Sequence, residues 1–317
     1  MKNVLTVMLC AASVMVGLQA KAAVWQPSSG HTQIPIWPGT PPDAQKLPGP
    51  EYALTRTSNK PKFAGKPVTG VFNVSRPTMT IYQPKGKNTG VAAVVFPGGG
   101  FQVLAIDLEG TEVCHWLTAI GVTCVLLKYR VPSAPYSWHC KCYDHGVLAT
   151  SVPSLQDARR TIRLVRFHAA KWHINPHKIG VIGFSAGGFL VAETSTDFTR
   201  RMYKPVGPAD KASDRPDFAL AIYPGHITVG HGLNPKLHFT RQTPPTFVLQ
   251  AEDAKVDSVR QSLAYYTALE KAGVPAELHI YAKGGHAFGL RHRKGFPVTD
   301  WPKLATIWLH TIGMLPK

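Results

Sequence analysis

Short blocks of apolar residues alternate with longer amphipathic segments along most of this chain. Near-continuous apolar runs are typical of strands that are buried on both faces of a sheet, and segments with apolar residues every three or four positions are typical of covering helices. The predicted strands are 78–82, 91–96, 122–127, 179–182, 218–223, 246–250 and 276–281.

The segments between these strands predict helices. The periodic stretches are 109–120, 154–173, 187–197, 258–272 and 301–312. Strands alternating with helices indicate an α/β fold with a mainly parallel central sheet and helices on both faces. We expect residues 71–317 to form this one domain.

The beginning of the chain has a different composition. Residues 1–22 have a basic start, an apolar stretch over 4–18 and the small-residue site Ala20-Lys21-Ala22, which is the pattern of a secretory signal peptide. The apolar stretch is too short to span a membrane. Residues 23–70, rich in Pro, Gly, Thr and Lys, predict an extended arm. We therefore expect a periplasmic or secreted protein with no membrane partner.

Export changes how the cysteines are interpreted. Cys10 would leave with the signal peptide, and an even number of cysteines in an oxidising compartment predicts disulfides. Cys140 and Cys142 are separated by one residue, which favours bridges to Cys114 or Cys124 over a bridge between them. Zinc binding by these four cysteines and free buried thiols are the alternatives.

The chain is strongly basic, with 35 Lys and Arg against 18 Asp and Glu and a formal net charge of +17. These residues are scattered and accompany no nucleic-acid motif, so we predict no nucleic-acid partner. A solvated basic surface is one interpretation, and attraction to an acidic polysaccharide is the other. The histidines between 225 and 242 lack a compact metal-ligand spacing, so we predict no metal and no cofactor.

A G-x-S-x-G sequence, Gly183-Phe-Ser-Ala-Gly187, lies between the predicted strand 179–182 and the predicted helix 187–197. This is the setting of a nucleophile elbow, in which the serine sits on a strained strand-to-helix turn. Side chains two residues before and after the serine would collide there, and the glycines remove them. Ser185 is therefore the predicted nucleophile.

A serine nucleophile needs a base and an orienting carboxylate, which follow it in the order acid and then His in such folds. His286 follows the last predicted strand and is preceded by two glycines. Asp253 follows strand 246–250 in a D-x-x-V arrangement and is the predicted acid, with Asp257 as the second candidate. The carboxylate that is not used is expected to be a solvated turn residue.

Backbone N–H groups must stabilise the negative oxygen of a tetrahedral intermediate. The triple glycine 98–100 directly follows strand 91–96, and its small residues allow the backbone to approach a substrate. We predict that Gly99 or Gly100, together with Ala186, forms this oxyanion hole. The predicted site residues all follow strands, as expected at the carboxyl edge of a parallel sheet.

These motifs resemble the bacterial α/β-hydrolase family of acetyl-esterase, acetyl-xylan-esterase and dienelactone-hydrolase-like proteins, which is related to prolyl-oligopeptidase-like hydrolases. The resemblance covers most of residues 37–310, and Pro97 departs from it where many members have His. It implies an α/β-hydrolase fold and esters of polysaccharides as substrates. Similar segments are Trp37–Thr40, Leu127–Val131, Gln156–Arg160, Ala272–Tyr281 and Gly285–Gly289.

The resemblance leads to one main functional hypothesis. The chain is expected to be an exported serine esterase that removes short acyl groups, chiefly acetyl, from polysaccharide or oligosaccharide esters through an acyl-enzyme. A peptidase or amidase, and a non-catalytic binding protein that retains the fold, are the alternatives. Phe101, Trp138 and Tyr223 are candidate substrate-binding residues, whereas Asp157 and Arg159 are expected to form a buried structural ion pair.

Overall fold

The computed structural model describes residues 24–57, 63–132 and 151–316. The predicted signal peptide, Trp138, Cys140 and Cys142 lie outside these ranges. No helix within them has the length and apolar character needed to cross a bilayer.

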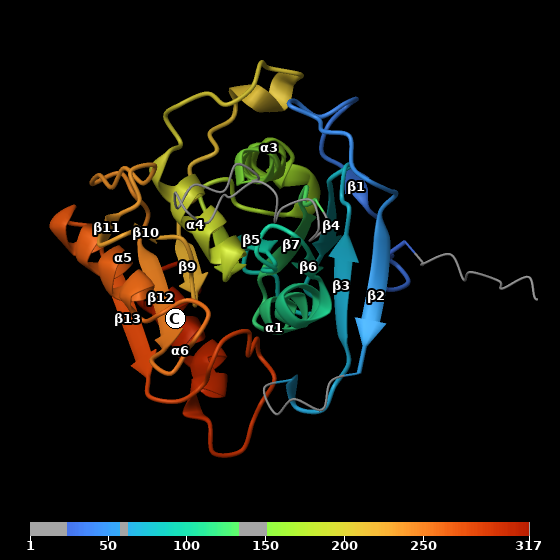
Figure 1. Ribbon diagram of the computed structural model, residues 1–317. Coiled ribbons are helices and arrows are strands. Elements are labelled where there is room, and N and C mark those ends of the chain that lie inside the picture. The colour runs from blue at the N-terminus through green and yellow to red at the C-terminus, as the bar shows by residue number, and fades with distance from the viewer. Residues whose placement is uncertain (1–23, 58–62, 133–150, 317) are drawn as a thin grey trace, which may run out of the picture.

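A central sheet of eight strands organises the described chain (Figure 1). In spatial order the strands are β1 (Ile34–Pro35), β4 (Thr78–Tyr82), β7 (Thr123–Lys128), β5 (Ala92–Phe96), β8 (Ile179–Phe184), β9 (Ala219–Ile222), β12 (Thr246–Ala251) and β13 (Ala276–Tyr281). The strands from β7 to β13 are parallel, while β4 is antiparallel to both of its neighbours. All the predicted strands are present, with small differences at their ends.

Helices cover both faces of this sheet, as predicted. They are α1 (Glu112–Ala119), α3 (Ser151–Phe167), α4 (Ala186–Thr196), α5 (Arg260–Lys271) and α6 (Trp301–Thr311). Figure 1 shows α1 and α6 on one side of the sheet and α3 on the other. The rings of Trp116 in α1 and Trp301 in α6 meet at 5.2 Å between centroids. Each residue of β5, β7, β8, β9 and β12 is buried, which explains their continuous apolar sequences.

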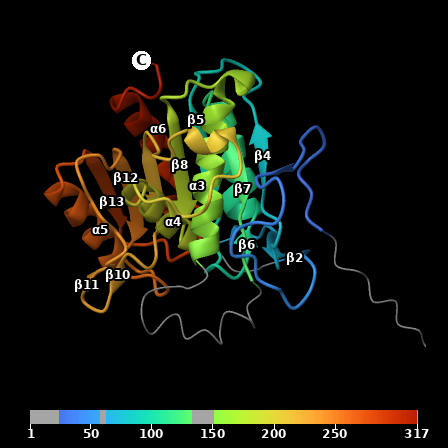
Figure 2. The same ribbon diagram turned by 90° about the horizontal axis from the view of Figure 1, so that it is seen from above.

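The predicted arm contributes strands as well as extended chain. β2 (Tyr52–Arg56) and β3 (Val68–Phe72) join β6 (Leu104–Ala105) in a second sheet of order β2-β3-β6, and β1 forms an edge of the main sheet. Figures 1 and 2 show the second sheet on the side of the molecule that carries β4. A third, two-stranded sheet pairs β10 (Thr228–Val229) with β11 (Gly232–Leu233). β3 crosses the predicted boundary at residue 70, and the division into an arm and a domain stays a prediction.

The disulfide differs from the expected pairing. Cys114 in α1 is bonded to Cys124 in β7, with 5.1 Å between their Cα atoms. The expectation that these residues would pair with Cys140 or Cys142 is therefore wrong. The bond joins a helix to the strand on which it packs, and both cysteines are fully buried.

Buried ion pairs fasten α3 to its surroundings. Asp157 accepts hydrogen bonds from the Trp37 indole at 2.8 Å and from the backbone N–H of Arg130 at 2.9 Å, and it pairs with the Arg130 guanidinium. Arg159 pairs with Asp214. Asp157 and Arg159 are thus structural ion-pair residues, as predicted, but their partners are not each other.

We expect Asp157→Ala to lower the free energy of unfolding by about 3–5 kcal/mol, because the change leaves the buried Arg130 without its counter-charge. Denaturant unfolding followed by circular dichroism measures this loss. Arg200→Ala is the matched control, since Arg200 is 65% exposed in its ion pair with Asp197 and such pairs contribute about 0–1 kcal/mol. Equal losses in the two variants would contradict the structural role of Asp157.

Candidate active site

Ser185 occupies the strained turn that the sequence predicts. β8 ends at Phe184, α4 begins at Ala186, and Ser185 between them has φ 53° and ψ −117°. A positive φ is unfavourable for a residue with a side chain, and such strain is concentrated at functional sites. The backbone N–H of Ser185 donates to the carbonyl of Ile222 at 3.1 Å, which ties this turn to the end of β9.

Two glycines make this turn sterically possible. A Cβ atom on Gly183 would overlap the carbonyl of Gly187, and a Cβ atom on Gly187 would overlap the carbonyl of Phe96 at the end of β5. Both contacts are with backbone, which cannot move aside as a flexible side chain can. The predicted reason for these glycines is therefore confirmed.

His286 reaches the serine from the loop after β13. Its Nε2 lies 2.9 Å from Ser185 Oγ, which is hydrogen-bond distance. The Tyr223 ring packs against the imidazole, with 5.0 Å between ring centroids. A serine and an imidazole in this relation form the nucleophile and base pair of serine hydrolases.

Asp253 holds the backbone of the His286 loop. Its Oδ1 accepts the N–H groups of Gly284 at 2.9 Å and Gly285 at 2.7 Å. Gly285 has φ +68°, a conformation that suits glycine. Asp253 therefore fixes the two residues that precede the candidate base.

Asp257 lies close to the nucleophile, whereas a solvated turn residue was expected. Its Oδ2 is 3.7 Å from His286 Nε2, on the side of the imidazole that faces Ser185. A Cβ atom on Gly225 would stand 2.7 Å from the Asp257 carboxylate oxygens, so Gly225 leaves the room that this side chain fills. Burial raises the pKa of Asp257 from 3.8 to about 6. The N-cap of α5 is Val259 and has no side-chain cap, so Asp257 does not cap that helix.

The glycine loop after β5 has the conformation that its sequence suggests. Gly99 has φ +132° and Gly100 has φ +63°. Both line the cavity that contains Ser185. Ala186 is the first residue of α4, where an N–H has no acceptor within the helix. The structure thus brings Gly99, Gly100 and Ala186 to the surroundings of the serine hydroxyl.

The cavity over Ser185 has a volume of about 430 Å³. Neither Phe101 nor Tyr223 is on its wall, and both side chains are fully buried. Phe101 instead packs against Phe189, with 6.5 Å between ring centroids. These two aromatic residues therefore pack on neighbouring rings and do not line the cavity, which differs from the expected substrate contact. Trp138 lies outside the described residues.

Several cavity residues carry no motif that sequence reasoning recognised. They come from the π-helical turn Asp107–Thr111, from the segment after β9 and from α5. Each is a common polar residue in a segment without a recognisable pattern, and only the tertiary fold brings them together. The polar lining residues that no motif marked are Glu109, Thr228 and Gln261, and His226, one of the histidines between 225 and 242, lines the cavity with them.

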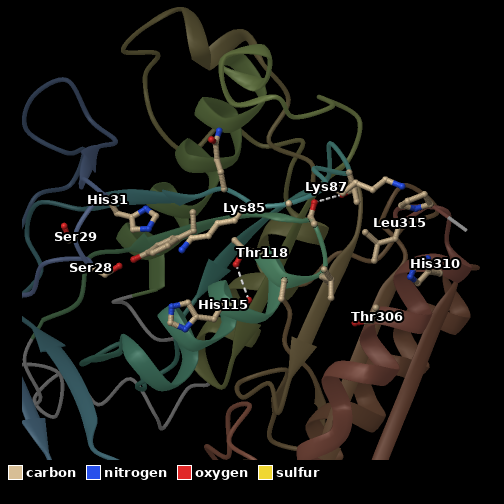
Figure 3. A pocket seen from close by; sticks show the side chains of 18 residues that line it. Ser28, Ser29, His31, Lys85, Lys87, His115, Thr118, Thr306, His310 and Leu315 are labelled. Carbon is tan, nitrogen blue, oxygen red and sulfur yellow. Dashed lines mark hydrogen bonds between the residues drawn. The ribbon is translucent and has the colours of Figure 1, made fainter.

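A second cleft, of about 790 Å³, lies away from this site. It includes Thr89 and Gly121, which precede β5 and β7, so it is at the opposite end of the parallel strands from Ser185. Figure 3 shows its lysine and histidine side chains, among them Lys85 and Lys87. It contains none of the predicted site residues. Attraction of the basic surface to an acidic polysaccharide stays a prediction.

Within residues 24–57, 63–132 and 151–316, no group of three or more His, Cys, Asp or Glu side chains could hold a metal ion.

The pKa of Asp257 gives a prediction for stability. Between pH 4 and 6 the folded state holds a proton on Asp257 that the unfolded state has lost, so the free energy of unfolding falls as pH rises through this window. Asp257→Asn does not titrate, and we expect it to gain roughly 1–3 kcal/mol over the wild type between pH 4 and pH 7.

Denaturant unfolding at pH 4, 5, 6 and 7 measures this difference. Asp300→Asn is the control, because the Asp300 side chain is 49% exposed. Parallel pH profiles for the wild type and Asp257→Asn would contradict the raised pKa.

Comparison with known proteins places the chain among enzymes of this architecture. The BD-FAE family model matches residues 79–222, which include the glycine loop and Ser185. An acetylxylan esterase of Xylanibacter ruminicola is 29% identical over 224 residues, 67% of this chain and 43% of that protein. Endo-1,4-beta-xylanase B of Butyrivibrio fibrisolvens is 25% identical over 228 residues, 64% of this chain and 33% of that protein. The chain thus spans less than half the length of these curated relatives.

Solved structures extend the likeness to nearly the whole chain. An acetyl ester-xyloside bifunctional hydrolase from Caldicellulosiruptor lactoaceticus, known from a crystal structure, shares 31% sequence identity with this chain. The two structures superpose with a TM-score of 0.68 over 90% of this chain and 97% of that one. A Thermogutta terrifontis esterase with bound propionate, 24% identical, shares the fold with a TM-score of 0.63 over 77% of this chain and 94% of its own. The predicted α/β-hydrolase fold is confirmed, and the chain belongs to the α/β hydrolases, with a segment that matches the BD-FAE model.

Proposed function

We propose that this protein is a serine hydrolase of carboxylic esters that removes short acyl groups, chiefly acetyl, from carbohydrate esters. The observation that carries the proposal is the 2.9 Å contact between His286 Nε2 and the hydroxyl of Ser185, made where Ser185 is held at φ 53°. This pair provides a nucleophile and the base that activates it. The relatives named for acetyl esters and xylan support the substrate class.

The reaction begins with attack of Ser185 Oγ on the ester carbonyl while His286 Nε2 takes the hydroxyl proton. The carbonyl oxygen becomes negative, and N–H groups of Gly99 or Gly100 and of Ala186 donate to it. The imidazolium then gives this proton to the sugar oxygen as the ester C–O bond breaks, so the sugar leaves as an alcohol and the acyl group stays on Ser185. Water activated by His286 releases the acid in a second round of the same steps.

Asp253 is the proposed orienting acid. Its hydrogen bonds to Gly284 and Gly285 hold the loop from which His286 projects. Asp257 approaches His286 at Nε2, the ring nitrogen that must exchange a proton with Ser185 and the leaving group. A carboxylate on that side cannot hold the imidazole without competing with the serine for the same nitrogen. The orienting role therefore fits Asp253 better than Asp257.

The central test is the hydrolysis of acetylated xylan and 4-nitrophenyl acetate by the wild type and Ser185→Ala. We expect acetate release from both substrates and a loss in kcat of roughly 10⁴-fold or more in the variant, because no other group supplies the nucleophile. 4-Nitrophenyl octanoate and an aminoacyl anilide test the acyl length and the amidase alternative. Turnover of the anilide alone would overturn the ester proposal, as would acetate release that survives the Ser185 substitution.

Matched amide variants assign the acid within the same experiment. In Asp253→Asn the side-chain oxygen still accepts from Gly284 and Gly285, so the variant removes the charge and keeps the loop. We expect it to lose roughly 10³–10⁴-fold in kcat, because a neutral amide does not stabilise the imidazolium that forms during the reaction. Asp257→Asn should stay within about tenfold of the wild type, because Asp257 does not carry the transferred proton and its loss should stay below that of a general acid or base. The reverse order would assign the orienting role to Asp257.

We also propose that the protein is exported to the periplasm or the medium. The pattern of residues 1–22 supports this, and the Cys114–Cys124 disulfide supports an oxidising compartment.

Expression in a host with a functional export pathway tests this proposal. We expect N-terminal sequencing of the extracytoplasmic protein to begin at Ala23, because the small-residue site ends at Ala22. Mass measurement before and after reduction should show the Cys114–Cys124 bond as a gain of two hydrogen atoms on the peptides that contain these cysteines. An uncleaved chain that remains in the cytoplasm would contradict export.

A further inference from the structure

Glu109 is a buried carboxylate beside the nucleophile that the proposed reaction does not use. It lies in the π-helical turn Asp107–Thr111, which leads directly into α1. Its side chain is directed back toward the end of β5 and lines the cavity over Ser185, although the residue is only 2% exposed. Placing a carboxylate in such a position is costly unless hydrogen-bond donors meet it.

The first donor comes from the glycine loop. Glu109 Oε2 accepts the backbone N–H of Gly98 at 2.8 Å. A Cβ atom on Gly98 would stand 2.5 Å from this oxygen and 2.6 Å from the carbonyl of Phe184, so the carboxylate is packed directly on the loop backbone. Gly98 immediately precedes the two glycines that are the candidate oxyanion donors.

The second donor connects the same carboxylate to the His286 loop. Glu109 Oε1 accepts the hydroxyl of Tyr223 at 2.8 Å, and this hydroxyl in turn accepts the N–H of Gly289 at 3.2 Å. Burial, and then the negative charge of Glu109, raise the pKa of Tyr223 well above its ordinary value, which keeps the hydroxyl protonated. The Tyr223 ring also packs on His286.

We propose that Glu109 is a positioning residue that fixes the oxyanion loop relative to the loop carrying the catalytic base. Its two oxygens join Gly98 on one side to Tyr223, and through it Gly289, on the other. The residue acts through these neighbours, and its role rests on the proposed function. Without it, the donors of Gly99 and Gly100 lose a fixed relation to Ser185 and His286.

Both carboxylate oxygens are needed as acceptors, which makes glutamine an informative replacement. An amide of the same shape has one acceptor oxygen and one NH₂ donor. Whichever way it turns, the NH₂ group faces either the Gly98 N–H or the Tyr223 hydroxyl, and one of the two bonds is lost or reversed. Glu109→Gln therefore preserves volume and weakens the joint, because an NH₂ group that donates to the Tyr223 hydroxyl leaves the proton of that hydroxyl without its acceptor.

The experiment measures kcat and KM of Glu109→Gln for 4-nitrophenyl acetate, with the inhibition constant of phenylboronic acid, whose tetrahedral serine adduct places an oxygen in the oxyanion hole. We expect kcat to fall about 10²-fold, as for a misplaced or missing oxyanion donor. The boronate inhibition constant should rise in step, while KM stays within about threefold, because ground-state binding does not use these donors. Thermal unfolding accompanies both measurements.

Glu193→Gln is the matched control, since Glu193 is another buried carboxylate, 3% exposed, on α4 and away from the cavity. It should retain the wild-type kcat and boronate affinity. Tyr223→Phe removes the hydroxyl and keeps the ring, and should weaken boronate binding to a smaller extent than Glu109→Gln. This variant decides the matter if Glu109→Gln does not fold.

Wild-type boronate affinity and kcat in a folded Glu109→Gln protein would overturn the positioning role, as would an equal loss in Glu193→Gln. An unchanged boronate affinity in Tyr223→Phe would overturn it when Glu109→Gln cannot be purified. Failure of the proposed function has a different signature, namely wild-type ester turnover that does not depend on Ser185.

Discussion

The site depends on how closely the β8–α4 turn approaches the end of β5. The carbonyl of Phe96 occupies the space where a Gly187 side chain would be, and the carbonyl of Gly187 does the same for Gly183. Ser185 has its strained conformation, with φ 53°, within this close packing of backbone on backbone. The same contact also sets the distance from the nucleophile to the glycine loop, which continues directly from β5.

The sheet order then determines what surrounds the serine. β5 and β9 are the two neighbours of β8, so the loops that follow them flank the nucleophile on opposite sides. The loops after β12 and β13 supply the acid candidates and His286. A carboxylate accepts from the backbone of each of two loops: Asp253 accepts two N–H groups of the His286 loop, and Glu109 accepts one from the glycine loop. Carboxylates bound to backbone donors are well suited to this, because such bonds are stronger than neutral ones.

Much of this arrangement could be predicted from the chain. Continuous apolar runs predict the buried parallel strands. Ser185 and His286 lie in glycine-containing motifs that directly follow predicted strands. The two-residue β1 was not predicted, because so short an edge strand has no periodicity. The small sheet of β2, β3 and β6 was missed because its strands are partly exposed and composed of mixed residues.

Other features depend on tertiary contacts that the sequence does not encode locally. Nothing near Cys114 or Cys124 marks them as partners, and their pairing follows from α1 packing on β7. Asp257 reads as a turn residue, yet the absence of a side chain at Gly225 lets it enter the cavity. Glu109 lies in what reads as an ordinary helix start, and its partners Gly98 and Tyr223 belong to two different strand ends.

The central claim is that Ser185 is the nucleophile that carries the acyl group. The most direct measurement is peptide mass spectrometry of the protein after reaction with a fluorophosphonate, with ester turnover followed in parallel. The account predicts one modified residue, Ser185, and loss of turnover in proportion to its modification. Full ester turnover by a protein whose Ser185 is completely modified would contradict it.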